Sequence, residues 1–351
     1  MDSITQLALG AAVGEAVLGR KIGNRALAWG AVAGTLPDLD VFVPLGDAVR
    51  DFTYHRSVTH SLFVLALATP LLVWLITRIH ADTRIYWRHW IAAIYGVFAT
   101  HVLLDSLTAY GTQIFWPLSD TPVSLSTIFI IDPVYTLPLL VGVVAALVMT
   151  RQTPRGHRVN RYGLILSSLY LSWTLAAKVV VESRFEAALE RQDIAYRAMF
   201  TTPAPFNSVL WRAVAVAVDG QGYFEGYYSL LDGGAEIDFK RYPSDETLLE
   251  SIDGHWPVRR LRWFSKGIYS VRDLDGDIVI SDLRMGIEPD YVFRFKVGEI
   301  GNPHPHPAAP EQLQAVRDFS RLPLLWERIQ DPSVELQPVP EAGNQGRTLV
   351  E

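Results

Sequence analysis

Histidines and aspartates recur in the first third of the chain at spacings that suit metal binding. His101 and Asp105 are four residues apart, which places an imidazole and a carboxylate on one face of a helix. His55 and His60 lie five residues apart just before a long apolar run, where a loop-to-helix junction can bring both onto one centre. Taken alone, each pair also fits an ordinary helix face or interfacial loop. Together they indicate coordination of a divalent cation.

Two further carboxylates, Asp38 and Asp40, follow Pro37. Because proline disfavours the helical conformation of the residue before it, here Leu36, we expect the backbone to unwind and to aim both carboxylates inward. A plain turn is the alternative. For Asp2, capping of the first helix is favoured slightly over a role as a ligand.

The site predicted from these motifs uses nitrogen and oxygen donors only, because the chain has no cysteine. Such donors favour Zn²⁺, with Mn²⁺ or Fe²⁺ as alternatives, and their number allows one ion or two. The predicted metal ligands are Asp38, Asp40, His55, His60, His101 and Asp105.

The predicted catalytic residues are Asp38, Asp40 and Arg56. One of the two carboxylates can act as a general base instead of a ligand. The guanidinium of Arg56 matches the geometry of an anionic group such as a phosphate, although a lipid headgroup contact or a salt bridge to Asp51 explains it equally. Thr59 is expected to cap the next helix or to hydrogen-bond a ligand.

The elements that must position these residues are apolar helices. Hydrophobic residues make up 49% of the 351 residues, and the mean hydropathy is +0.16. The run from Ser61 to Ile79 contains no acidic residue and only Arg78 as a basic one, and it is long enough to cross a hydrocarbon core of about 30 Å. We expect a bundle of about six transmembrane or re-entrant helices, over residues 4–18, 27–45, 61–79, 90–107, 128–149 and 162–181.

The distribution of arginine and lysine predicts which way these helices face. Basic residues cluster in the loops around residues 20–25, 78–88 and 151–161, which are therefore expected to be cytoplasmic. Both termini, the soluble part and the histidines and aspartates of the predicted site would then lie on the outer side of the membrane. Asp2 and Asp132 would lie at the same depth.

After about residue 182 the composition becomes that of a soluble protein, and three regions are predicted. Residues 1–182 form the membrane helical domain with the metal site. Residues 183–301 form a small α+β soluble domain, which starts with an amphipathic helix over Ser183–Phe200 and continues as an antiparallel sheet. Residues 302–351 comprise a Pro-rich linker, a helix over Pro310–Gln330 and a disordered tail from about Ser333.

Several classes of function are excluded by the sequence. The net charge of −6 and the lack of a basic stripe interleaved with aromatic residues argue against nucleic acid as a partner. A serine-hydrolase elbow, a phosphate-binding loop and a dinucleotide fingerprint are all absent. The lipid bilayer is the one partner that the sequence predicts.

The ordered motifs resemble those of a bacterial inner-membrane family of the YdjM type, whose members are assigned by sequence as metal-dependent hydrolases. The resemblance rests on Leu-Pro-Asp-Leu-Asp (36–40), His-Arg-Ser-Val-Thr-His-Ser (55–61), His-Val-Leu-Leu-Asp (101–105) and Ala-Tyr-Gly-Thr with Trp-Pro-Leu (109–118). It implies a membrane-bound hydrolase with these histidines and aspartates as metal ligands. Relatives commonly have a histidine near the start, where this chain has Gln6.

The leading functional hypothesis is therefore a membrane-bound, metal-dependent hydrolase that attacks a lipid or another membrane-proximal ester or phosphodiester with metal-activated water. The alternative is a non-enzymatic membrane protein, either a scaffold that presents the soluble sheet or an ion or proton carrier. A carrier needs ionisable groups across the whole membrane. We expect the inner halves of the predicted helices to be bare of such groups, which argues against a carrier.

Overall fold

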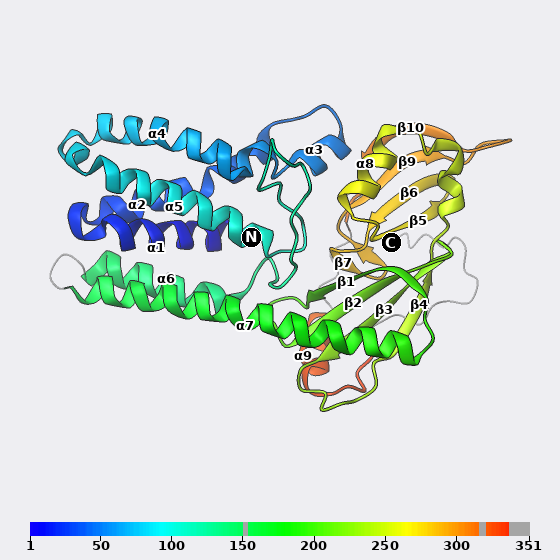
Figure 1. Cartoon of the computed structure of the whole chain (residues 1–351). Coiled ribbons are helices and arrows are strands. Elements are labelled where there is room, and N and C mark those ends of the chain that lie inside the picture. Colours follow the sequence, from blue (N-terminus) through cyan, green and yellow to red (C-terminus); the bar gives the residue numbers. More distant parts are fainter. Residues whose placement is uncertain (150–153, 316–320, 337–351) are drawn as a thin grey trace. The chain divides into compact units, whose positions relative to one another are not determined.

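The computed structural model describes residues 1–149, 154–315 and 321–336 of the chain. It divides into two compact units, each described here by itself (Figure 1). The first, called the helical unit, comprises Met1–Val43, Tyr54–Ala176 and Pro205–Asn207. The second, called the sheet unit, comprises Pro44–Thr53, Ala177–Ala204 and the residues from Ser208 onward.

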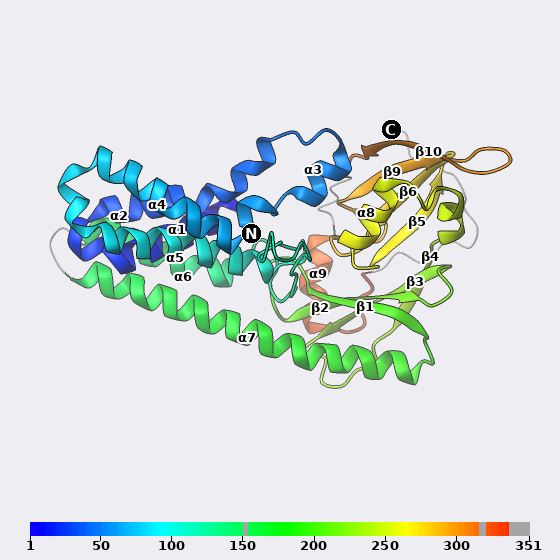
Figure 2. The ribbon, with the colours of Figure 1, turned by 45° about the horizontal axis from the view of Figure 1, so that its top comes forward.

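The helical unit is a set of helices that run alongside one another (Figures 1 and 2). Its helices are α1 (Ser3–Ile22), α2 (Asn24–Thr35), α4 (Leu62–Ile79), α5 (Trp87–Ser106), α6 (Pro133–Met149) and the first part of α7 (Arg155–Arg191), with 3₁₀ segments η1 (Pro37–Phe42), η2 (Val58–His60) and η3 (Ala81–Tyr86). Helix α1 contacts α2, α5 and α6 and so lies at the centre of the unit.

Glycines explain why α1 and α2 pack so closely. A Cβ atom on Gly10 would lie 2.3 Å from the carbonyl oxygen of Gly30, and one on Gly34 would lie 2.6 Å from the carbonyl oxygen of Gln6. Any larger residue would force the two backbones apart. Gly10 with Gly14, and Gly30 with Gly34, form small-xxx-small patterns, and both patterns lie at this contact.

Only part of the expected six-helix membrane bundle is supported. By length and composition, two helices of the described chain can cross a membrane, α4 and α7, and α6 is a shorter apolar helix. Helix α2 has 12 residues and a length of about 18 Å, which is too short for a hydrocarbon core of about 30 Å. The structure confirms a helical first half but does not confirm six spanning helices.

The structure differs from expectation at Pro37. Leu36 keeps helical dihedrals, φ −59° and ψ −43°, and the chain tightens into the 3₁₀ segment η1 instead of unwinding. Proline has no N–H to continue the ladder of α2, but it fits the first turn of a new helical segment. The single apolar segment expected over residues 27–45 is therefore α2 followed by η1.

Helix α7 is longer than expected. A span over 162–181 and a separate helix over Ser183–Phe200 were predicted, but one helix runs to Arg191, and strand β1 begins at Tyr196. The apolar spacing continues through residue 181 without a breaking residue, so Val181, Phe185 and Leu189 line one buried face. That face packs against the first sheet of the sheet unit.

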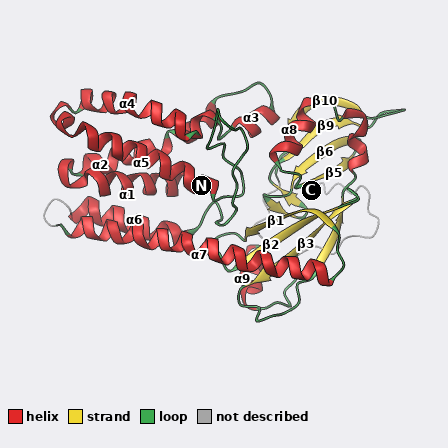
Figure 3. Cartoon of the chain, in the orientation of Figure 1, coloured by secondary structure: helices red, strands yellow, loops and turns green. Residues whose placement is uncertain are grey.

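The sheet unit contains two four-stranded antiparallel sheets (Figure 3). The first has the order β1-β2-β3-β4, and the second β10-β9-β6-β5. The strands are β1 (Tyr196–Pro203), β2 (Leu210–Ala217), β3 (Gly222–Ser229), β4 (Phe239–Pro243), β5 (Tyr269–Leu274), β6 (Asp277–Asp282), β9 (Arg294–Glu299) and β10 (His306–Gln312), with a separate pair β7 (Gly286–Ile287) and β8 (Asp290–Tyr291). The antiparallel sheet expected from the sequence is confirmed, and β2–β3 and β5–β6 are hairpins in it.

The last region differs from the linker and helix that were expected. Residues 306–312 are not a linker, because strand β10 pairs there with β9. The helix expected over Pro310–Gln330 is reduced to α9 (Leu322–Gln330), and most of the tail expected to be disordered, residues 337–351, lies outside the described residues.

The sheet unit also includes three short helical elements, α3 (Ala48–Tyr54), η4 (Glu246–Ile252) and α8 (Trp256–Phe264). Phe52 of α3 packs against Phe264, Phe293 and Phe295, with ring centroids 4.4–5.1 Å apart. The segment just before His55 is therefore held by aromatic packing within the sheet unit.

Candidate metal centre

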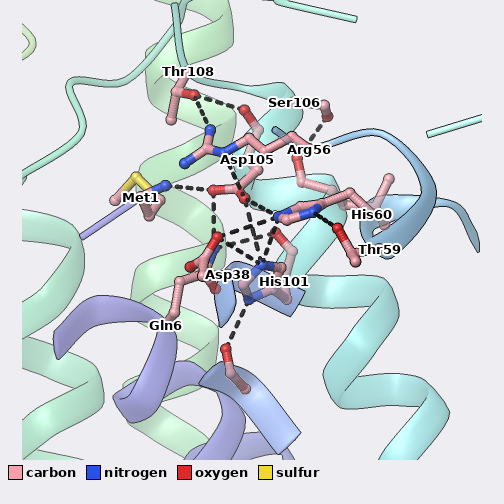
Figure 4. A network of polar contacts seen from close by, with 12 residues as sticks. Met1, Gln6, Asp38, Arg56, Thr59, His60, His101, Asp105, Ser106 and Thr108 are labelled. Carbon is pink, nitrogen blue, oxygen red and sulfur yellow. Dashed lines mark hydrogen bonds and ion pairs between the residues drawn. The ribbon is translucent and has the colours of Figure 1, made fainter. Parts of the chain in front are cut away.

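Four of the six predicted ligands converge on one point of the helical unit (Figure 4). Asp38 comes from η1, His60 from η2, and His101 and Asp105 from successive turns of α5. One nitrogen or oxygen atom from each lies within 4.8 Å of the corresponding atoms of the other three.

The distances between these atoms are long for hydrogen bonds. His60 Nε2 lies 3.2 Å from Asp38 Oδ1, 3.3 Å from Asp105 Oδ2 and 3.3 Å from His101 Nε2. His101 Nε2 lies 3.4 Å from Asp105 Oδ2. These separations are at or beyond the upper end of good hydrogen bonds, and two ring nitrogens face each other.

The protonation of His101 is set by a backbone group. Its Nδ1 lies 2.8 Å from the carbonyl oxygen of Gly34 on α2. A carbonyl oxygen can only accept, so Nδ1 carries the proton and the neutral ring offers a lone pair at Nε2. This is the arrangement of metal-binding histidines, whose second nitrogen is commonly held by a carbonyl or carboxylate.

Three of the four residues are buried, and the two carboxylates favour a positive charge between them. His60, His101 and Asp105 are fully buried, and the side chain of Asp38 is 23% exposed. Asp105 Oδ2 is buried without a hydrogen-bond partner that meets normal geometry. A cation would satisfy that oxygen, so the residues present fit a metal ion.

Asp40 and His55 lie outside this set of four and form a second layer around it. His55 Nδ1 is 2.8 Å from Asp40 Oδ1, and Asp40 Oδ2 accepts from the backbone N–H of Arg56 at 3.1 Å. Asp40 Oδ2 lies 3.8 Å from His60 Nδ1. Direct coordination by these two residues stays a prediction.

Arg56 lies beside the cluster. Its backbone has a φ of 62°, which is uncommon for a residue other than glycine, and its guanidinium stacks 5.1 Å over the ring of Tyr110. Its Nε is 3.4 Å from Asp105 Oδ2. Asp51 accepts instead from the backbone N–H of Leu45, so no salt bridge of Arg56 to Asp51 appears in the described structure.

The beginning of the chain also reaches the site. Gln6 Nε2 donates to Asp105 Oδ1 at 3.0 Å, and the amino group of Met1 contacts the same oxygen (Figure 4). Gln6 therefore supports a carboxylate of the cluster through its amide nitrogen. Asp2 caps α1 by accepting from the backbone N–H groups of Ile4 and Thr5, which confirms its favoured role.

Two functional contacts escaped sequence reasoning. Neither the carbonyl of Gly34 nor the ring of Tyr110, which meets His55 edge-on at a centroid distance of 5.4 Å, was predicted to touch the site. A signal existed for Tyr110, which lies in the Ala-Tyr-Gly-Thr motif (109–112). Backbone carbonyls carry no such signal.

Two other buried acidic residues of the helical unit, Asp132 and Glu15, have structural partners. Asp132 caps α6 by accepting from Val134 and accepts from the hydroxyl of Tyr170 at 2.7 Å. Glu15 is buried in α1 and bonded to Asn160 of α7 at 2.5 Å, and it also contacts His157. The expectation of bare inner helix halves was therefore wrong, because Glu15 and its partners lie on the far side from the cluster.

These features describe a helical unit with two candidate membrane-spanning helices and a candidate metal-binding cluster of two histidines and two aspartates. A family model described as YdjM inner membrane protein matches residues 1–181, just over half of the chain, and the chain belongs to this family. The resemblance drawn from the motifs is thereby confirmed. No curated protein and no solved structure matches the chain.

Proposed function

We propose that this protein is a membrane-bound, metal-dependent hydrolase. The observation that carries the proposal is the convergence of Asp38, His60, His101 and Asp105, whose ligand atoms lie within 4.8 Å of one another. Two imidazole nitrogens and two carboxylate oxygens suit Zn²⁺, with Mn²⁺ or Fe²⁺ as alternatives. Four donors fit one ion, and a second ion would need Asp40 and His55, which are already bonded to each other.

When bound, such an ion lowers the pKa of a coordinated water and polarises the bond that is attacked. The protein's own residues supply the rest of the chemistry. Asp38 is the most exposed member of the cluster, so we propose that substrate and water enter from its side. Its Oδ1 faces His60 and His101, so its second oxygen is the better candidate for the general base, since both oxygens of Asp40 are occupied by hydrogen bonds.

Arg56 is proposed to stabilise an anionic group of the substrate. Its guanidinium is held by the ring of Tyr110 and by Asp105, and it lies at the edge of the cluster. A cation in this place favours a phosphodiester or the oxyanion formed from an ester. Both reactions develop negative charge next to the attacked centre.

A lipid is the favoured substrate. Asp38 and Asp40 lie among exposed apolar side chains in η1 and just after it. These apolar residues, 49–79% exposed, are Leu39, Val41, Phe42 and Val43. An apolar rim beside a charged site suits a molecule with an apolar tail and a polar head. We further propose that the site opens to the outer face of the inner membrane, as the basic loops predict.

The test uses the full-length protein in detergent. Elemental analysis should find a bound divalent metal, and His60→Ala and His101→Ala should each lose it, whereas the matched control His89→Ala on α5 keeps it. Hydrolysis of a long-chain phospholipid in mixed micelles should fall in the two site variants and after chelation. Unchanged metal content in both site variants would overturn the assignment, and full lipid hydrolysis after complete metal removal would overturn the mechanism.

A further inference from the structure

We infer that Thr59 and Asp40 are positioning residues that hold His60 in the tautomer able to bind a cation. The inference rests on the proposed metal site and explains what holds one of its ligands in place. It starts from a difference between the two histidines. The Nδ1 atom of His101 is fixed by a backbone carbonyl, whereas that of His60 faces side chains.

The contacts form a short relay. His60 Nδ1 is 3.0 Å from Thr59 Oγ1, and Thr59 Oγ1 is 2.7 Å from Asp40 Oδ2. The direct distance from His60 Nδ1 to Asp40 Oδ2 is 3.8 Å, which is too long for a hydrogen bond. The hydroxyl of Thr59 therefore bridges the imidazole and the carboxylate.

Counting protons gives the relay a direction. A carboxylate accepts only, so the single hydroxyl proton of Thr59 is donated to Asp40. The oxygen of Thr59 then has only lone pairs to offer, and His60 must donate its proton from Nδ1. The lone pair of His60 is left at Nε2, the atom that lies 3.2 Å from Asp38 and 3.3 Å from Asp105.

Asp40 is itself fixed from two further sides. Its Oδ1 is bonded to His55 Nδ1 at 2.8 Å, and its Oδ2 accepts from the backbone N–H of Arg56 at 3.1 Å. The segment that carries His55 and Arg56 and the segment that carries Asp40 are thus joined at one carboxylate. The relay accordingly assigns His55 and Asp40 a supporting function, and it explains why both lie next to the cluster but not in it.

The alternative is that His60 carries its proton at Nε2 and only closes an ion-paired network with the two aspartates. In such a network Nδ1 would be an acceptor and no lone pair of His60 would face the cluster, so loss of the hydroxyl of Thr59 would not change the binding of a cation. The two arrangements therefore predict different outcomes when the hydroxyl is removed without a change in shape.

The experiment compares Thr59→Val with Thr59→Ser in the full-length protein. Co²⁺ binding is followed by its d–d absorption, Zn²⁺ affinity by competition with a chromophoric chelator, and folding by the thermal melt of the metal-free protein. Loss of support for a ligating histidine typically weakens metal binding by about 10–100-fold. We expect that loss for Thr59→Val, with an altered Co²⁺ spectrum, and near wild-type values for Thr59→Ser.

A matched control is Thr100→Val on α5, one residue before His101, whose hydroxyl donates only to carbonyl oxygens of its own helix. It should bind metal like the wild type. Wild-type affinity and spectrum in Thr59→Val would overturn the inference while the metal site stands, and so would equal losses in Thr59→Ser and Thr59→Val. A wild-type protein that binds neither ion would overturn the proposed site together with the inference.

Discussion

Replacement of Gly30 by alanine tests whether close packing of α1 and α2 holds the candidate site together. A Cβ on Gly30 would lie 2.3 Å from the carbonyl oxygen of Gly10 and 3.2 Å from the Cα of Gly14. Ordinary contacts of a Cβ begin at 3.4 Å, so the two backbones must separate by roughly 1 Å. Overpacking of this kind costs about 1–3 kcal/mol.

Helix propensity works in the opposite direction, since alanine is favoured over glycine inside a helix by about 1 kcal/mol. The matched control is Gly96→Ala on α5, where the new Cβ would meet only Val13 at 3.6 Å. Both substitutions share the propensity gain, so the difference in their free energies of unfolding isolates the packing cost. We expect Gly30→Ala to be less stable than Gly96→Ala by about 1–3 kcal/mol.

Unfolding would be measured by circular dichroism on the purified protein in detergent. A second readout is metal affinity, because α2 carries the Gly34 carbonyl that holds His101 and leads directly into Asp38. Separation of α1 from α2 should therefore weaken metal binding in Gly30→Ala but not in Gly96→Ala. Equal stability of the two variants would refute the packing argument.

Three further predictions concern single contacts, each read from thermal or denaturant unfolding. Asp2→Ala removes the cap of α1 and should cost about 1 kcal/mol, whereas Asp82→Ala, which breaks an exposed ion pair, should not change stability measurably. Arg212→Met leaves the carboxylate of Glu225 buried without its counter-charge and should cost about 3–5 kcal/mol, with part of the loss recovered when both residues are made apolar. Phe52→Ala empties an aromatic cluster and should cost about 3–5 kcal/mol in the sheet unit.

The helices and most hairpins could be predicted because their signals are local. The apolar run that became α4 and the antiparallel pairing that follows the membrane part were correctly predicted. Strands β1 and β10 were missed because their burial pattern is irregular, and β10 contains two prolines in seven residues. The length of α7 was missed because hydropathy marks where a membrane segment ends, whereas a helix ends only where its hydrogen-bond ladder is interrupted.

The donor types of the candidate site were predictable, but their arrangement in two layers was not. In an extended, unwound backbone, side chains two residues apart point the same way. Asp38 and Asp40 would then both have faced one ion. The chain instead forms the 3₁₀ segment η1, with about three residues per turn, so side chains two positions apart point about 120° from each other.

That rotation separates the two carboxylates by function. Asp38 turns toward His60 and His101, and Asp40 turns toward His55 and Thr59. The same Pro37 that suggested an unwound segment begins the 3₁₀ turn, and so it decides which aspartate faces the cluster. Relatives that keep the order Pro-Asp-x-Asp should then show the same division, with the first aspartate essential for metal content and the second, like Thr59, required for affinity.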